Sequence, residues 1–299
     1  MTKSKKSVPA MRVVEGARPA AAFGAEHAAD LSRPKVHTIV VASGKTGVGK
    51  SSIAANLAVA LGQRGARVVL VDADLAQSHL DLLLGVHPRF DLGQVINREK
   101  SVDEILVPGP TGVMLVPGPS ALRPIGALDD IRRETLLRSL SVVDPAADLM
   151  IIDAPWGAGR ETLELCRIAH EVIVVASTEV MSLPDAYALL KSLQKADALM
   201  RAPRLLLNMA TTDDEADEIV ARMSVFARHF MKLEVESLGS IPYDHSVTRA
   251  EHAQEPLVMS QPQSPAAIAI RALATRMWKP APAGPDFVEK SDLPRRLEA

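Results

Sequence analysis

Cysteine is almost absent, with Cys166 the only one among 299 residues. A single cysteine can neither form an internal disulfide nor build a cysteine-based metal site, so the composition suits a reducing compartment. We expect Cys166 to be a small, buried apolar residue. Aromatic residues are also scarce, at 3% of the chain against 47% hydrophobic residues in total. Leucine, isoleucine, valine and alanine must therefore fill most of the core.

The chain also lacks long apolar runs and a strong net charge. No run is long enough to span a bilayer, and charged residues interrupt the stretch after the N-terminal lysines, where a signal peptide needs an apolar segment. We therefore expect a cytoplasmic protein, with a peripheral position at the inner membrane or a cell pole left open. The formal net charge is −2, so no overall field would draw the molecule to nucleic acid or anionic lipid, although a local patch could.

The distribution of residues predicts one folded domain between two flexible ends. Residues 1–34 are rich in alanine, proline and charge, which predicts a flexible arm, and residues 279–299 form a proline-containing flexible tail. Within residues 35–278, short β-branched runs alternate with helical patterns, which indicates a parallel sheet with helices on both faces. The predicted strands are residues 36–42, 67–72, 112–116, 149–153, 171–176, 204–208 and 238–241.

Three predicted helices carry further information. Ser182, with Asp185 three residues later, predicts a capped N-terminus for a helix that buries residues 186, 189, 190 and 193. A later helix would place Phe226 and Phe230 on its apolar face. The last helix is predicted over residues 264–278, and we expect its apolar stripe to pack on the sheet, although contact with a membrane stays open.

The most specific motif follows the first predicted strand. Residues 43–52 contain the pattern Gly-x-x-x-x-Gly-Lys-Ser between a strand and a helix, as a phosphate-binding loop requires. Its glycines let backbone amides wrap phosphate oxygens, and the helix N-terminus favours negative charge. Lys50 would contact the β- and γ-phosphates, Ser51 would ligate Mg²⁺, and Ser52 would lie close to the α-phosphate. The predicted nucleotide-binding residues of this loop are Gly44, Lys45, Thr46, Gly47, Val48, Gly49, Lys50, Ser51 and Ser52. The fold class is thus α/β, a three-layer α/β/α P-loop NTPase with a mainly parallel central sheet.

Three aspartates at predicted strand ends complete the candidate site. The carboxyl ends of parallel strands lie beside the phosphate crevice. Asp72 would hold Mg²⁺ through its waters, and Asp153, after four apolar residues, would place a second carboxylate near the metal. Asp74 would position or deprotonate the attacking water, because phosphoryl transfer depends on placement and charge neutralisation. Alternatively, Asp72 and Asp74 are simply a pair of aspartates at the N-terminus of a helix and have no role in the site.

Lys45, five residues before Lys50, makes the loop resemble the deviant Walker A group of P-loop ATPases, the MinD/ParA family. The resemblance covers residues 36–278 and implies ATP and Mg²⁺ as ligands, with catalytic roles for Lys45, Lys50 and Asp74. It also implies that Lys45 reaches the phosphates of the partner subunit in an ATP-dependent homodimer; a solvated surface lysine is the alternative. Two departures stand out. Thr46 replaces the usual glycine, and its β-branched side chain narrows the backbone angles available at that position. Residues 153–159 form a second switch that is longer than usual and contains Trp156, which either contacts a partner or anchors the loop.

The resemblance also implies a binding site for the base. Asn208, at the end of a predicted strand, matches the asparagine that reads the adenine edge in this family. The segment Ile-Pro-Tyr-Asp matches the loop that packs beside the base and contributes Pro242, Tyr243 and Asp244. With Ser51, Asp72 and Asp153 as metal ligands, these residues complete the predicted site.

Several segments are similar to the flagellar-number regulator branch of the family, known as FlhG or FleN. They are residues 71–85, 109–118, 182–191 and 238–256, and the sharpest is Ser-Leu-Pro-Asp-Ala-Tyr-Ala-Leu-Leu-Lys at 182–191. The resemblance implies control of flagellar number or placement, through a flagellar SRP-type GTPase, a C-ring component or a flagellar transcription activator. Residues 26–32 are at most a degenerate form of the branch's N-terminal GTPase-activating motif.

Two other functions remain open. A ParA-like partition or cargo-positioning ATPase would bind DNA nonspecifically through a basic face. The candidate residues for that face are Arg201, Arg204, Arg222, Arg228 and Lys232. A non-hydrolysing, ATP-dependent scaffold is the other, motivated by Thr46 and the longer second switch.

Overall fold

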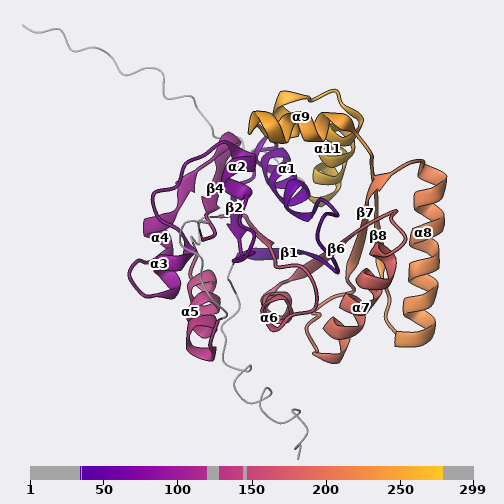
Figure 1. The fold of residues 1–299 in the computed structure, drawn as a ribbon, viewed down its shortest axis with the longest axis horizontal. Helices are drawn as coiled ribbons and strands as arrows, with labels where there is room; N and C mark the ends of the chain where they lie inside the picture. Colours follow the sequence, from indigo (N-terminus) through magenta and orange to yellow (C-terminus); the bar gives the residue numbers. More distant parts are fainter. Residues whose placement is uncertain (1–33, 35, 120–127, 144–146, 279–299) are drawn as a thin grey trace, which may run out of the picture. The chain divides into compact units, whose positions relative to one another are not determined.

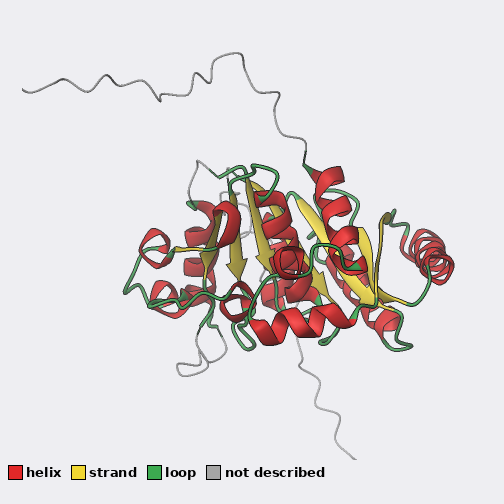
Figure 2. Cartoon of the chain, turned by 90° about the horizontal axis from the view of Figure 1, so that it is seen from above, coloured by secondary structure: helices red, strands yellow, loops and turns green. Residues whose placement is uncertain are grey.

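The computed structural model describes residue 34 and residues 36–119, 128–143 and 147–278. The predicted N-terminal arm and C-terminal tail lie outside this part of the chain, apart from Pro34. Within it, the alternation of short apolar runs and helical patterns does produce a sheet between two layers of helices, so the predicted fold class is confirmed (Figures 1 and 2).

The sheet has eight strands in the order β3-β4-β2-β5-β1-β6-β7-β8, and all neighbours are parallel except β3 and β4. Its strands are β1 (His37–Ser43), β2 (Val68–Asp72), β3 (Val107–Pro108), β4 (Val113–Val116), β5 (Leu149–Asp153), β6 (Glu171–Ser177), β7 (Arg204–Ala210) and β8 (Glu236–Pro242). The seven predicted strands are confirmed. The two-residue edge strand β3 was not predicted, because two residues are too few to show an alternating pattern.

The helices divide between the two faces of the sheet. They are α1 (Lys50–Gly62), α2 (Leu80–Leu84), α3 (Leu92–Ile96), α4 (Val102–Ile105), α5 (Asp130–Ser141), α6 (Arg160–Ile168), α7 (Ser182–Lys195), α8 (Asp213–Phe226), α9 (His245–Ala253), α10 (Leu257–Ser260) and α11 (Pro265–Met277). In Figure 1, α1, α9 and α11 lie above the sheet, while α6 and α7 lie below it. Helix α1 is apolar on almost all sides because it packs against four strands and against α11.

The last helix packs as expected. Helix α11 buries Ala267, Ile270, Leu273 and Ala274, and its neighbours are α1 and β8. Its apolar stripe therefore belongs to the core of the domain. In the described part of the chain, every helix is too short or too polar to cross a membrane. Cys166 is fully buried, and burial raises the pKa of its thiol to about 12.

Two details of the predicted helices were wrong. Ser182 is the first residue of α7 and does not cap it; its Oγ accepts a hydrogen bond from the Ser177 amide (2.8 Å) and so joins the helix to β6. Phe226 and Phe230 are 52% and 64% exposed instead of buried. A π-helical segment, Ala227–Met231, follows α8. This segment changes the rotation per residue, so a face extrapolated with α-helical spacing fails at Phe230. Phe226 precedes it as the last residue of α8 and lies beside the buried stripe of Ala216, Val220 and Met223.

The polar core residue Asn56 provides a test of this packing. Its Oδ1 accepts a hydrogen bond from the Val258 amide in α10 (3.1 Å), and its Nδ2 donates to the Ser52 carbonyl (2.9 Å). We expect Asn56→Ala to lower the free energy of unfolding by about 1–3 kcal/mol, because it leaves a buried amide without an acceptor. Urea unfolding measures this, with Thr275→Ala on the exposed face of α11 as the control. Equal stabilities of the two variants would contradict the assignment.

Candidate active site

The phosphate-binding loop lies between β1 and α1, at the carboxyl edge of the sheet. Its two positive-φ positions are both glycines, Gly47 (79°) and Gly49 (82°), where a side chain would strain the backbone. Thr46 is not at a positive φ, so this departure from the usual glycine fits the loop without that strain. A Cβ on Gly44 would collide with the backbone carbonyl of Asp185 in α7. The loop therefore has a fixed position against α7.

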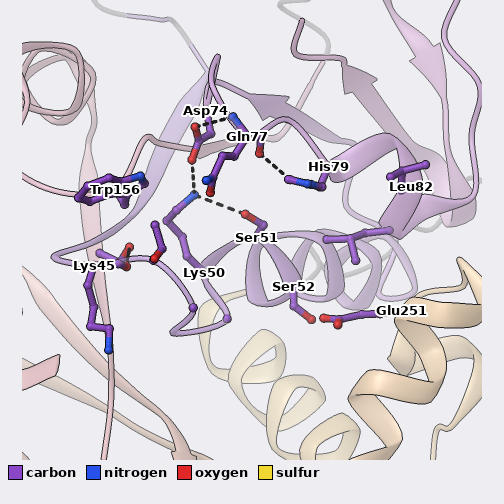
Figure 3. Close-up of a pocket in the computed structure, with 15 residues that line it drawn as sticks. Lys45, Lys50, Ser51, Ser52, Asp74, Gln77, His79, Leu82, Trp156 and Glu251 are labelled. Carbon is purple, nitrogen blue, oxygen red and sulfur yellow. Dashed lines mark hydrogen bonds and ion pairs between the residues drawn. The ribbon is translucent and has the colours of Figure 1, made fainter. Parts of the chain in front are cut away.

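Lys50 is the centre of the site (Figure 3). Its side chain is only 7% exposed, and its Nζ donates a 2.6 Å hydrogen bond to Asp153 Oδ1. The same nitrogen lies 3.8 Å from Asp74 Oδ2, as the dashed line in Figure 3 marks. The Ser51 hydroxyl is 3.4 Å from the same nitrogen. The structure thus brings Lys50, Ser51, Asp74 and Asp153 together as the sequence predicted. A buried ammonium of this kind can be shared between carboxylates and a phosphate group.

Asp72 and Asp153 face each other across two neighbouring strands. They are register partners at the ends of β2 and β5, and both are 1% exposed. Asp72 Oδ2 accepts hydrogen bonds from Ser78 Oγ (2.8 Å) and from the Leu80 amide (3.0 Å), whereas its buried Oδ1 has no hydrogen-bond partner. Burial raises the pKa of Asp72 to about 7, and the nearby Asp153 carboxylate adds to the rise.

This arrangement fits the predicted magnesium ion. Mg²⁺ prefers oxygen ligands and is usually held by one or two carboxylates together with phosphate oxygens and water. The unpartnered oxygen of Asp72, the carboxylate of Asp153 and the hydroxyl of Ser51 supply such ligands within one small region. Burial also raises the pKa of Asp153, against the opposing effect of Lys50. A divalent cation would neutralise both carboxylates.

Asp74 follows the end of β2 and lines the same pocket as Lys50. Its Oδ1 accepts a hydrogen bond from the Gln77 amide (3.1 Å), which leaves Oδ2 on the side of Lys50. Figure 3 shows the Asp74 carboxylate and the Lys50 ammonium turned toward each other. This position is compatible with the predicted role of Asp74 in placing the attacking water, a role that stays a prediction.

Lys45 has the opposite orientation. Its side chain points away from Lys50 and Ser51 in Figure 3, and its Nζ forms an ion pair with Glu179 (2.5 Å), in the loop between β6 and α7. The two side chains are 28% and 62% exposed. One loop therefore presents an inward and an outward lysine. The residues after Glu179 are apolar and exposed: Val180 (86%) and Met181 (61%).

Residues 153–159, predicted to be a longer second switch, are anchored to β1. The Gly157 amide donates to the Ser43 carbonyl (2.8 Å), and the Ala154 amide donates to the Val41 carbonyl (3.1 Å). Trp156 lies between these anchors, is 50% exposed and lines the pocket beside Lys45. The ring thus covers part of the site and leaves a large apolar surface open.

The structure does not place the predicted base-binding residues in the pocket that contains Lys50. Asn208 is 8% exposed, and its Nδ2 donates to the Val48 carbonyl (2.8 Å), so it supports the phosphate-binding loop. Tyr243 is 59% exposed. Pro242 and Asp244 adjoin it at the end of β8 and the start of α9. A role of these four residues at the base stays a prediction.

Asp244 has a clear structural role. One carboxylate oxygen accepts from the Ser246 amide (2.7 Å) and caps α9, and the other accepts from the Ala266 amide (3.1 Å) at the start of α11. Partial burial would raise its pKa, but these hydrogen bonds and one from Ser264 outweigh burial and lower the pKa. Asp244 therefore fixes α9 against α11.

Several residues that line the pocket were not predicted from the sequence. They are Gln77, His79, Leu82, Leu83 and Glu251. The first four follow Asp74 in the loop and helix after β2, where the rule that ligands bind beyond strand ends could have suggested them. Glu251 comes from α9, nearly 200 positions after Ser52, and no local motif marks it.

Asp72 generates a testable prediction about stability. A folded-state pKa above the unfolded value of 3.8 means that the ionised group destabilises the fold as pH rises from about 4 to 7. We expect Asp72→Asn to raise the free energy of unfolding of the nucleotide-free protein at pH 8 by about 1–3 kcal/mol. The gain should shrink toward pH 4. Thermal unfolding at the two pH values measures this.

The same variant should lose the extra stability that Mg²⁺ with ATP gives to the wild type, because the unpartnered oxygen of Asp72 is replaced by an amide. A variant that is less stable than the wild type at pH 8, or that keeps the full stabilisation by Mg²⁺ and ATP, would contradict the assignment.

Comparison with known proteins agrees with this geometry. Residues 39–257 match the family model of the CobQ/CobB/MinD/ParA nucleotide binding domain. The chain is similar to the antiactivator FleN of Pseudomonas aeruginosa, with 35% identity over 84% of this chain and 89% of FleN. It is also similar to the flagellum site-determining protein YlxH of Helicobacter pylori, with 32% identity over 68% of each chain. Among solved structures, MinD of Pyrococcus horikoshii complexed with Mg-ADP has a TM-score of 0.66 and 25% identity, over 81% of this chain and 96% of that one. The chain therefore belongs to the MinD/ParA family of ATP-binding P-loop ATPases.

Proposed function

We propose that this chain is an ATP-driven spatial regulator that dimerises when it binds Mg²⁺ and ATP. It limits the number of flagella or sets their placement. The observation that carries the proposal is the opposite orientation of the two loop lysines. Lys50 turns into its own site, whereas Lys45 turns outward to the exposed Glu179. An outward lysine can reach the phosphates of a second copy once it leaves Glu179.

The surface around Lys45 supports association of two copies. Trp156 lines the pocket together with Lys45, and the exposed apolar residues Val180 and Met181 directly follow Glu179, the ion-pair partner of Lys45. Large exposed apolar residues on one face are typical of protein–protein contacts. A second copy would cover them and would also close the nucleotide site against water, which strengthens the electrostatic interactions inside it.

The flagellar part of the proposal is supported by the relatives. FleN is named an antiactivator and YlxH a flagellum site-determining protein, and both names describe regulators. The proposed partners are a flagellar transcription activator, a C-ring component or a flagellar SRP-type GTPase. ATP hydrolysis would then time a switch, slowly and with stimulation by a partner. The proposed location is the cytoplasm, including its periphery at the inner membrane or a cell pole.

The structure gives less support to a DNA-binding face. Four of the five candidate basic residues form ion pairs with nearby glutamates: Arg201, Arg204, Arg222 and Arg228. Their charge is already balanced at short range, which reduces the field available to phosphates. A non-hydrolysing scaffold is also less favoured, because Asp74 lies beside Lys50 and Thr46 is not at a positive φ.

Substitution of Lys45 tests the dimer. We expect the wild type to change from monomer to dimer when Mg²⁺ and ATP are added, and Lys45→Ala to weaken dimer formation roughly 30-fold or more, because a desolvated charge pair between subunits is lost. Binding of ATP by the monomer should persist, since Lys45 points away from its own site. Light scattering measures the mass, and calorimetry measures nucleotide binding. Lys100→Ala, at an exposed ion pair away from the site, is the matched control. A dimer that survives Lys45→Ala would contradict the proposal.

Deletion of the gene tests the cellular role. Cells without this chain should carry more flagella or misplace them, and expression of the wild-type chain, but not of Lys45→Ala, should restore the normal pattern. Electron microscopy of single cells gives the number and position. An unchanged pattern in the deletion strain would reject the flagellar role and leave the ATPase assignment intact.

A further inference from the structure

Trp156 places a large aromatic ring at the charged end of the nucleotide pocket, the end that also contains Lys45, Lys50 and Asp74. Figure 3 shows the ring on the side of Lys45 and Asp74, with Glu251 at the opposite end of the pocket. Half of the Trp156 side chain is exposed. Because exposed apolar surface costs free energy in water, this ring is stabilised when another group covers it.

The backbone that carries the ring is held on both sides. The Gly157 amide donates a hydrogen bond to the Ser43 carbonyl in β1 (2.8 Å). On the other side, the Pro155 carbonyl accepts a hydrogen bond from Oγ1 of Thr162 (3.1 Å), a fully buried residue in α6. Trp156 therefore projects from a fixed backbone between the sheet and α6, which is what a contact residue requires.

The face of an indole ring selects the charge of the group that covers it. Its π-electrons give the face a partial negative charge, so the face attracts an ammonium or guanidinium group but not a phosphate or a carboxylate. In the single chain, both loop lysines already have acidic partners: Lys50 donates to Asp153, and Lys45 forms an ion pair with Glu179. The exposed ring is therefore suited to a cation from a second molecule.

The proposed dimer would bring such a cation to this end of the pocket. Lys45 turns outward and would reach the phosphates of a second copy. The β- and γ-phosphates would lie at Lys50, close to Asp74, which is the end that Trp156 lines. The arriving ammonium group would then lie between phosphate and indole. In a dimer with two-fold symmetry this contact forms twice, once at each nucleotide.

We propose that the indole face of Trp156 binds the ammonium group of Lys45 from a second copy of this chain through a cation–π interaction. This inference rests on the proposed ATP-dependent dimer, and it adds a contact residue from the predicted second switch to that dimer. The lysine then exchanges one partner in the single chain, Glu179, for two partners in the dimer, a phosphate and an aromatic ring.

Trp156→Leu tests the ring, because leucine keeps an apolar side chain and removes the π-electrons. With Mg²⁺ and ATP, we expect this variant of the full chain to raise the dissociation constant of the dimer roughly tenfold, since a desolvated cation–π contact is lost at both sites. Trp156→Phe should weaken the dimer less, because it keeps an aromatic face. Light scattering over a concentration series measures the constant. A Trp156→Leu dimer as tight as the wild type would overturn the inference.

A double-mutant cycle then identifies the cation. In a Lys45→Gln background, which lacks the charge, Trp156→Leu should weaken the dimer little further. In a Lys45→Arg background it should weaken the dimer as in the wild type, because a guanidinium group also stacks on aromatic rings. Met200→Ala, at an apolar residue that is 48% exposed in the loop before β7, is the matched control and should weaken the dimer in neither background.

Equal weakening by Trp156→Leu with and without the charge of Lys45 would overturn the inference, since it would indicate that the ring is covered by apolar groups. If Lys45→Gln stays monomeric at every accessible concentration, the Trp156 variants decide alone, and a Trp156→Phe dimer no tighter than that of Trp156→Leu would overturn the inference. Wild-type protein that stays monomeric with Mg²⁺ and ATP would instead reject the proposed function itself.

Discussion

The buried ammonium group of Lys50 is the interaction on which the rest of the site depends. It lies among carboxylates from two strand ends, in contact with Asp153 and within 4 Å of Asp74. At such low exposure the charges are poorly screened, so each depends on its neighbours for stability. Asp72 adds a third carboxylate close to Asp153, and one of its oxygens has no partner. The nucleotide-free site therefore has more negative than positive groups, which favours the entry of a cation.

The charged groups of the site meet only because the neighbouring strands β2 and β5 pair in a particular register. Asp72 and Asp153 meet because β2 and β5 are parallel neighbours that end at the same level. Lys50 reaches them because the loop between β1 and α1 is short and contains glycines at its two positive-φ positions. A shift of one residue in any of these strands would turn a carboxylate toward the opposite face of the sheet. The apolar residues of the strands thus fix the positions of the charged ones.

The sequence was sufficient to predict most of the sheet and the phosphate end of the site. Both depend on local patterns: continuous apolar strands, a glycine-rich loop and aspartates at strand ends. It was not sufficient where tertiary contacts decide. Ser182 bonds to β6 instead of capping its helix, and Phe230 is exposed where the helix changes its winding. The Lys45–Glu179 pair joins residues 134 positions apart, and no spacing rule predicts such a contact.

Trp156 has a practical consequence for anyone who studies this chain in solution. Only two tryptophans are present, and the indole nitrogen of Trp278 is buried, whereas the Trp156 ring is half exposed at the mouth of the site. Indole fluorescence depends strongly on the polarity around the ring. Both tryptophans contribute to the intrinsic emission of the unlabelled protein, but a change in that emission on ligand entry or subunit contact should come largely from Trp156, so that a spectrometer can follow these events in real time without an added dye.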